Sequence, residues 1–224
     1  MTTDRVQHGY SFMKDLTQAW TAERNSPDIL PFSTLLIEGA MTRLRAQIDT
    51  VESMATDNER IFFKLVIMQI EIERIKFLLR SYLRTRISKI DRYLMFCNRD
   101  EVTSGHLSAL ERHYAEKHQM ILERHYHTSF MKNAPESGHL RKLDDTGAAG
   151  LSMIDKPNLN RAVFCKIIKP LQESDKLRSE AYDLEVGNTV LIRYNLVKPF
   201  LYTVCVHSLK KSKANSVQDT VQLL

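Results

Sequence analysis

The feature that most limits the fold of this chain is a long stretch, from Asp57 to Leu94, that contains neither glycine nor proline. These two residues are the strongest helix breakers, so their absence predicts one continuous helix that begins at a cap on Asp57 or Asn58 and ends near Leu94. At ~1.5 Å per residue such a helix is roughly 55 Å long. A compact chain of 224 residues is only about 45 Å across. We therefore expect the helix to extend beyond its own domain.

The apolar side chains of this helix cover more than one of its faces. A heptad-like seam is formed by Leu65, Met68, Ile72, Ile75, Leu79 and Tyr82. Other apolar side chains widen that surface, at Phe63, Val66, Ile67, Ile70, Phe77, Leu78 and Leu83. A helix that is apolar over more than one stripe must be covered from more than one side. Since the chain supplies only one or two flanking helices, we expect other protein chains to cover the remainder.

The rest of the N-terminal part predicts further helices, because apolar residues recur at helical spacing over 11–24, 33–55 and 104–132. The first of these ends at the Asn-Ser-Pro sequence that finishes with Pro27. The fold class we expect is mainly α, with an N-terminal helical bundle domain built around the long central helix.

The C-terminal part has a different pattern. Glycines and polar residues, which follow Pro135, predict a linker over 136–155. Runs of β-branched and aromatic residues then predict strands at 162–168 and 189–194. We therefore expect an α-helical assembly domain at 1–135 and a small β-rich domain at 156–224. A module of this size has a thin core and gains stability by docking onto something larger.

Composition and motifs argue against an enzyme. The three cysteines, Cys97, Cys165 and Cys205, are too widely spaced for a zinc ribbon and favour a reducing compartment. No signal peptide is expected, and the most apolar stretch, 61–72, is too short to span a membrane. Phosphate-loop, dinucleotide and nucleophile-elbow motifs are missing, and the clustered histidines lack zinc-ligand spacing. We expect no catalytic residues, no metal and no cofactor.

A basic run on the long helix leaves three interpretations open. It consists of Arg80, Arg84, Arg86, Lys89 and Arg92, which fan around the helix. We favour ion pairing with acidic residues of a partner subunit, which gives specificity more than affinity. A solvated face with weak internal pairs is the second interpretation. The third is a basic helical module that binds nucleic acid by tracking phosphates.

Four stretches then point to a family. They are QAWTAERNSPDIL at 18–30, QIEIERIKFLLRSYLRTRISKIDRY at 69–93, PNLNRAVF at 157–164 and DLEVGNTVLIRY at 183–194. In this order they resemble the Sld-five subunit family of the eukaryotic GINS complex. The resemblance runs from about residue 16 onward, and the 69–93 stretch is its most specific part.

The resemblance implies a role and partners. GINS is a heterotetramer that joins the Mcm helicase ring and a Cdc-type co-activator in the replicative helicase. The chain would be a non-catalytic structural subunit that assembles with three Psf-type subunits in the nucleus. It would help to assemble and activate the helicase for initiation and elongation of DNA replication, with DNA contact indirect at most.

The helix pattern and the resemblance together predict two sets of residues. The subunit-interface set is Leu65, Met68, Ile72, Glu73, Arg74, Ile75, Leu79, Tyr82, Leu83, Arg84, Arg86, Lys89 and Ile90. The structural set is Trp20, Pro27, Leu30, Pro157, Leu159, Gly187, Arg193 and Tyr194. The segment 203–218 has no counterpart in the family pattern and predicts an insertion before a last strand near 219–224.

Overall fold

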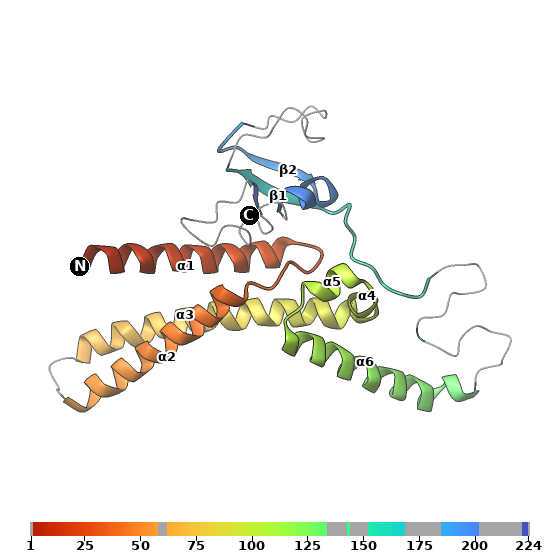
Figure 1. The fold of residues 1–224 in the computed structure, drawn as a ribbon, viewed down its shortest axis with the longest axis horizontal. Helices are drawn as coiled ribbons and strands as arrows, with labels where there is room; N and C mark the ends of the chain where they lie inside the picture. Colours follow the sequence, from red (N-terminus) through yellow and green to blue (C-terminus); the bar gives the residue numbers. More distant parts are fainter. Residues whose placement is uncertain are drawn as a thin grey trace. The chain divides into compact units, whose positions relative to one another are not determined.

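In the computed structural model, helices form the N-terminal part of the chain and a small sheet follows them (Figure 1). The structure describes residues 2–57, 62–133, 143, 152–168, 185–201 and 221–223. The elements are α1 (Thr2–Asn25), α2 (Thr34–Asp57), α3 (Phe62–Arg92), α4 (Leu94–Arg99), α5 (Glu101–Gly105), α6 (Ala109–Ser129), η2 (Met131–Asn133), β1 (Ala162–Ile167), β2 (Thr189–Arg193) and β3 (Val221–Leu223). Residues 194–201 are also helical. The predicted fold class, mainly helical with a small sheet near the C-terminus, is confirmed.

Several helix boundaries differ from the sequence-based prediction. The first helix starts at Thr2 rather than near residue 11. The central helix α3 has 31 residues over Phe62–Arg92, a length of about 46 Å. Its predicted start lies at the last residue of α2, Asp57, or at position 58, outside the described residues. The predicted helix 104–132 was wrong at its start, because the chain ends α5 at Gly105 and begins α6 after Ser108. There Ser108 Oγ accepts from the Glu111 amide at 3.2 Å, and Glu111 Oε2 accepts from the Ser108 amide at 2.9 Å. This reciprocal capping box fixes the true helix start.

The chain divides into two compact units that interleave along the sequence. One consists of 1–27, 33–83 and 159–224, and the other of 28–32 and 84–158. The helix α3 contributes residues to both units. The sequential division into 1–135, 136–155 and 156–224 stays a prediction. Most of the predicted linker and the predicted insertion at 203–218 lie outside the described residues.

In the first unit, a three-stranded antiparallel sheet of order β2-β1-β3 packs on α1. Alternate residues of β1 point inward, as expected for a sheet with one buried face. Tyr194 is fully buried at the centre of the sheet core, and Ala22 of α1 packs against that core. The Ser26 hydroxyl donates to Tyr194 Oη at 3.1 Å. The small sheet therefore completes its core on a helix, as its size predicted.

In the second unit, a buried ion pair lies beside an apolar core. The Arg86 side chain has no exposed surface, and its Nε donates to Glu111 Oε1 at 2.7 Å. Its Nη1 donates to the Leu30 carbonyl at 2.7 Å, and its Nη2 donates to the His106 carbonyl at 3.1 Å. The guanidinium also lies 5.2 Å from the Phe32 ring centroid. One side chain thus joins α3, the segment before α2 and the turn before α6.

We predict that Arg86→Met destabilises the full chain by about 3–5 kcal/mol, because it leaves the Glu111 carboxylate buried without its cation. Urea unfolding of the full chain measures the loss. The matched control is Arg84→Met, since Arg84 is exposed on the same helix and such a change shifts stability by no more than ~0.5 kcal/mol. Equal losses in the two variants would show that the buried pair adds nothing.

Candidate protein-interaction faces

The predicted heptad-like seam of α3 faces the chain's own helices. Ile72, Leu79 and Tyr82 are buried within the single chain. Leu65 and Ile75 are half-buried. The seam therefore supplies the core of this chain first, and its contact with partner chains stays a prediction.

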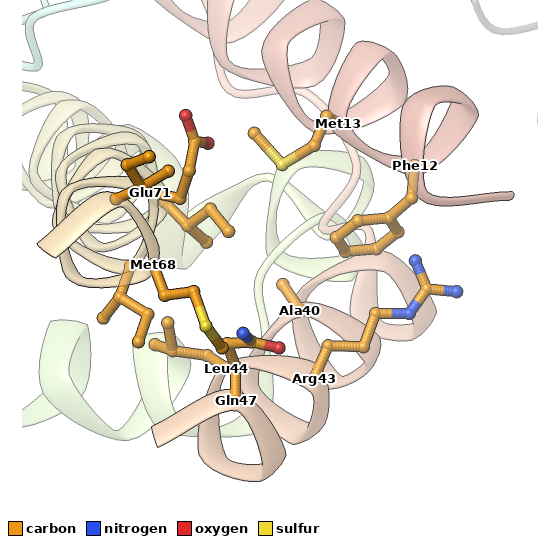
Figure 2. A pocket seen from close by; sticks show the side chains of 11 residues that line it. Phe12, Met13, Ala40, Arg43, Leu44, Gln47, Met68 and Glu71 are labelled. Carbon is orange, nitrogen blue, oxygen red and sulfur yellow. The ribbon is translucent and has the colours of Figure 1, made fainter. Parts of the chain in front are cut away.

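A hollow of about 290 Å³ lies where α1, α2 and α3 meet (Figure 2). Its lining is mostly apolar and includes Leu44 of α2 with Met68 of α3. The Phe12 ring of α1 lies at the hollow with the Arg43 guanidinium 4.1 Å from its centroid. Glu71 is the one carboxylate in the lining. An apolar hollow without a pair of acid and base groups offers packing space rather than catalysis.

The opposite side of α3 carries a second apolar stripe that is exposed. We call it the α3 face, and it consists of Phe63, Val66, Ile67, Ile70 and Phe77. At its borders Ile67 also lines the hollow and Phe77 also meets the Trp20 ring of α1. At 3.6 residues per turn these five positions fall within an arc of about 100°, centred roughly 160° from the seam. Phe63 is 76% exposed and Ile70 is 61% exposed. Contiguous exposed apolar surface of this kind marks a site of protein association.

In the second unit, α6 carries a narrower exposed stripe. We call it the α6 face, and it consists of Leu110, Tyr114 and Ile121, with Lys117 between the last two. These three apolar positions lie within an arc of about 40°. Leu110 is 83% exposed. Glu111 and Ala115, both buried, lie roughly 80–120° around the helix from this face. The helix α6 thus has one side for its own core and another for solvent or a partner.

The basic run does not form a single surface patch. Arg86 is buried, and Lys89 Nζ donates to the Asp28 carbonyl at 2.7 Å. Arg80, Arg84 and Arg92 are exposed. Binding along a phosphate backbone requires solvent-exposed cations. Two of the five basic side chains do not meet this requirement, which weakens the nucleic-acid interpretation.

The other predicted interface residues on α3 are divided between surface and core. Arg74 pairs with Glu71 at 2.6 Å, and Glu73 pairs with Lys76 at 2.8 Å, on exposed turns of the helix. The Lys76 hydrogen bond holds the pKa of Glu73 below its ordinary value. Leu83 is exposed, whereas Ile90 is fully buried in the second unit.

The residues predicted to be structural are mostly half-buried or buried. Trp20 Nε1 donates to Ser81 Oγ at 2.8 Å, and its ring meets Phe77 edge-on. Gly187 has a φ of 98°, which favours glycine in the turn before β2. The remainder are Pro27 and Tyr194, which are buried, Leu30, Pro157 and Leu159, which are half-buried, and Arg193, which is exposed.

Polar clusters within the described residues do not assemble into a metal or nucleophile site. No group of three or more His, Cys, Asp or Glu side chains there is placed to hold a metal. His106 Nδ1 lies 3.1 Å from the Ile29 carbonyl, which fits a packing role. His118 Nδ1 lies 3.1 Å from Asp91 Oδ1 in a geometry that falls short of a hydrogen bond. Among the same residues, no helix is long and apolar enough to cross a membrane.

Two thiols are buried and held in the protonated form. Burial raises the pKa of Cys165 to about 12. Burial, aided by the nearby Asp100 carboxylate, raises the pKa of Cys97 to about 11. The thiolate is the reactive form of cysteine, so both side chains are poor nucleophiles.

We predict that iodoacetamide at pH 8 labels Cys97 and Cys165 at least ~100-fold more slowly in the folded chain than in urea, since a two-unit rise in pKa lowers the thiolate fraction by that factor. Peptide mapping by mass spectrometry reads each site separately. Both pKa values lie above the ordinary value of 9.0, so the thiols' contribution to stability is present below pH 9 and is lost as pH rises toward 11–12. Equal labelling rates in the folded and unfolded chain would contradict this.

Comparison with known proteins gives a consistent result. Residues 41–130 match the family model for Sld5, described as the GINS complex protein helical bundle domain. The chain is 35% identical over 200 residues to the DNA replication complex GINS protein sld5 of Schizosaccharomyces pombe, across 89% of this chain and 91% of that one. It is 38% identical over 186 residues to the Chaetomium globosum protein of the same name, across 81% and 83%. The Saccharomyces cerevisiae relative is 29% identical over 229 residues, across 84% and 76%.

Proposed function

Because this chain belongs to the Sld5 family of GINS complex proteins of DNA replication, we propose that it builds a GINS heterotetramer through the α3 face and the α6 face. As a member of this family it is a non-catalytic structural protein. Membership in the GINS complex implies that its partners include other GINS subunits. The partners proposed for the two faces are the three Psf-type subunits.

The observation that carries this proposal is the exposed apolar surface on helices whose opposite sides are already buried. Ile72 and Leu79 fill the inner side of α3, while Phe63 and Ile70 remain largely exposed on its outer side. A chain whose core is already filled and whose helices still expose such apolar stripes is suited to association with other helices. Apolar side chains in the core of such an interface supply most of the binding energy.

The exposed cations of α3 set the specificity of the same assembly. Arg80 and Arg84 are exposed on the helix that carries the α3 face. Charged side chains at the rim of an interface guide partner choice and association rate more than affinity. We therefore assign them to acidic side chains on a partner subunit, in agreement with the interpretation favoured by the sequence.

The assembled complex acts within the replicative helicase. In this proposal the tetramer joins the Mcm ring and the Cdc-type co-activator in the nucleus, and it supports initiation and elongation. DNA contact is made by the larger assembly. The family resemblance of the 69–93 stretch and the match of residues 41–130 support this placement.

We predict that Ile70→Asp blocks recovery of the chain with co-expressed GINS subunits, because it places a charge at the centre of the α3 face. A charge buried without a partner costs several kcal/mol, comparable with the whole stability of a typical interface. The free chain should keep its helical circular dichroism, since Ile70 is exposed. Affinity purification through a tag on a partner subunit measures the loss.

The matched control is Leu35→Asp, which introduces the same charge at an exposed apolar residue of α2 outside both faces. This variant should assemble normally. Normal recovery of Ile70→Asp, or equal loss in both variants, would remove the α3 face from the proposal.

We predict a separate loss for Ile121→Asp on the α6 face. Ile121 is 64% exposed, so this change also leaves the fold of the free chain intact. Native mass spectrometry of the co-expressed complex should reveal subcomplexes that lack the subunit covering α6. The control is Thr128→Asp, one of the polar positions further along the same exposed side of α6. An intact tetramer with Ile121→Asp would show that the α6 face contacts no subunit.

A further inference from the structure

The outward face of the small sheet has a composition unusual for a surface exposed to water. β1 and β2 pair antiparallel with Phe164 directly opposite Leu191. Phe164 is 58% exposed and Leu191 is 52% exposed. Single exposed apolar residues are common on protein surfaces, but a paired aromatic and aliphatic side chain makes a continuous apolar spot.

The hydrogen-bond pattern brings these two side chains close together. The Ile167 amide donates to the Asn188 carbonyl, and the Tyr194 amide donates to the Arg161 carbonyl. Hydrogen-bonded pairs alternate with non-hydrogen-bonded pairs along an antiparallel ladder. Phe164 and Leu191 therefore form a non-hydrogen-bonded pair, whose Cα atoms lie about 4.5 Å apart and whose side chains approach most closely.

A cation lies at each end of this apolar spot. Arg193 is paired with Ala162, and Lys166 is paired with Thr189, so the two cations lie on the same face as Phe164 in opposite directions along the strands. Both are exposed, and neither forms an ion pair with another described residue. We call each of these cross-strand pairs a row. The Arg193 row and the Lys166 row are four residues apart, which corresponds to about 13 Å along a strand.

The charge around the sheet has the same sign. The described residues 159–168 and 185–201 of this unit contain four basic residues and one acidic one, a difference of +3. The basic residues are Arg161, Lys166, Arg193 and Lys198, and the acidic one is Glu185. A positive surface with an apolar centre selects a negatively charged partner that also carries an apolar side chain.

We propose that this outward sheet face binds an extended acidic segment of a partner protein, with an apolar anchor flanked by acidic residues two positions away on each side. In an extended segment those two acids are also about 13 Å apart, which matches the separation of the Lys166 and Arg193 rows. The anchor packs on Phe164 and Leu191, and the carboxylates pair with the two cations. A duplex nucleic acid is disfavoured, since its phosphate backbone has nothing to place on the apolar centre. The inference is independent of which chains cover the α3 and α6 faces.

The test measures binding of labelled peptides to the full chain within its co-purified complex, by fluorescence anisotropy at low salt. The probe contains the sequence Asp-Ser-Leu-Ser-Glu between Gly-Ser flanks. The comparison peptides replace both acids by lysine or the leucine by serine. We expect the probe to bind at least ~10-fold more tightly than either comparison peptide, a ratio that corresponds to ~1.4 kcal/mol. Equal binding of the three peptides, or no binding, would overturn the proposal.

Variants locate the binding site. Lys166→Glu, Arg193→Glu and Leu191→Ser should each weaken binding of the probe at least ~5-fold, as expected for residues at the centre of a small interface. All three side chains are exposed, so the complex should purify normally. Lys156→Glu makes the same charge change outside the sheet and should leave binding unchanged. An equal loss with Lys156→Glu would show that only net charge matters and would overturn the proposal.

A single-stranded oligonucleotide of similar charge tests whether the sheet face binds nucleic acid instead of an acidic peptide. We expect it to bind no more tightly than the acidic peptide and to be insensitive to Leu191→Ser. If it binds more tightly and loses affinity in Lys166→Glu and Arg193→Glu, the face is a phosphate-binding surface and the peptide proposal is wrong.

Discussion

The fold of the second unit depends on the buried pair of Arg86 and Glu111. Arg86 donates to the Glu111 carboxylate and to the carbonyls of Leu30 and His106, while Glu111 also accepts from the Ser108 amide at the start of α6. The same carboxylate thus neutralises a buried cation and caps a helix. Neither group could be buried alone without a large loss of free energy. The pair therefore fixes where α6 begins relative to α3, and with it the side of α6 that faces solvent.

The first unit is organised around α1. Trp20 on this helix bonds Ser81 of α3, while Ala22 packs on the core of the sheet and Ser26 bonds Tyr194. One helix thus contacts both α3 and the buried face of the sheet. Among the described residues of this unit, the outward apolar surfaces include the α3 face and the paired Phe164 and Leu191. The unit thus builds its core from its own side chains and exposes apolar surface that partner chains can cover, as expected of a structural subunit.

Sequence patterns gave the helices, the strands and the need for partners, but they did not determine which apolar face of α3 is outward. Both the seam containing Ile72 and the stripe containing Ile70 are apolar, and periodicity does not reveal which one α1 and α2 cover. From the sequence Arg86 looked like one of five surface cations. Its burial depends on pairing with Glu111, 25 residues away, and the residues next to Arg86 in the sequence do not indicate that pairing. The Ser108 and Glu111 capping box was readable in the sequence, and it would have corrected the predicted start of the fourth helix.

Hydroxyl-radical footprinting of the purified GINS assembly measures whether a partner chain covers the α3 face. In the single chain Phe63 is 76% exposed and Leu35 is 89% exposed, so the two side chains should react at comparable rates relative to their intrinsic reactivity if neither is covered. We predict that Phe63 and Ile70 are protected in the assembly while Leu35 stays reactive. Reaction of Phe63 and Ile70 in proportion to their single-chain exposure would contradict it, because the α3 face would then be open in the complete complex.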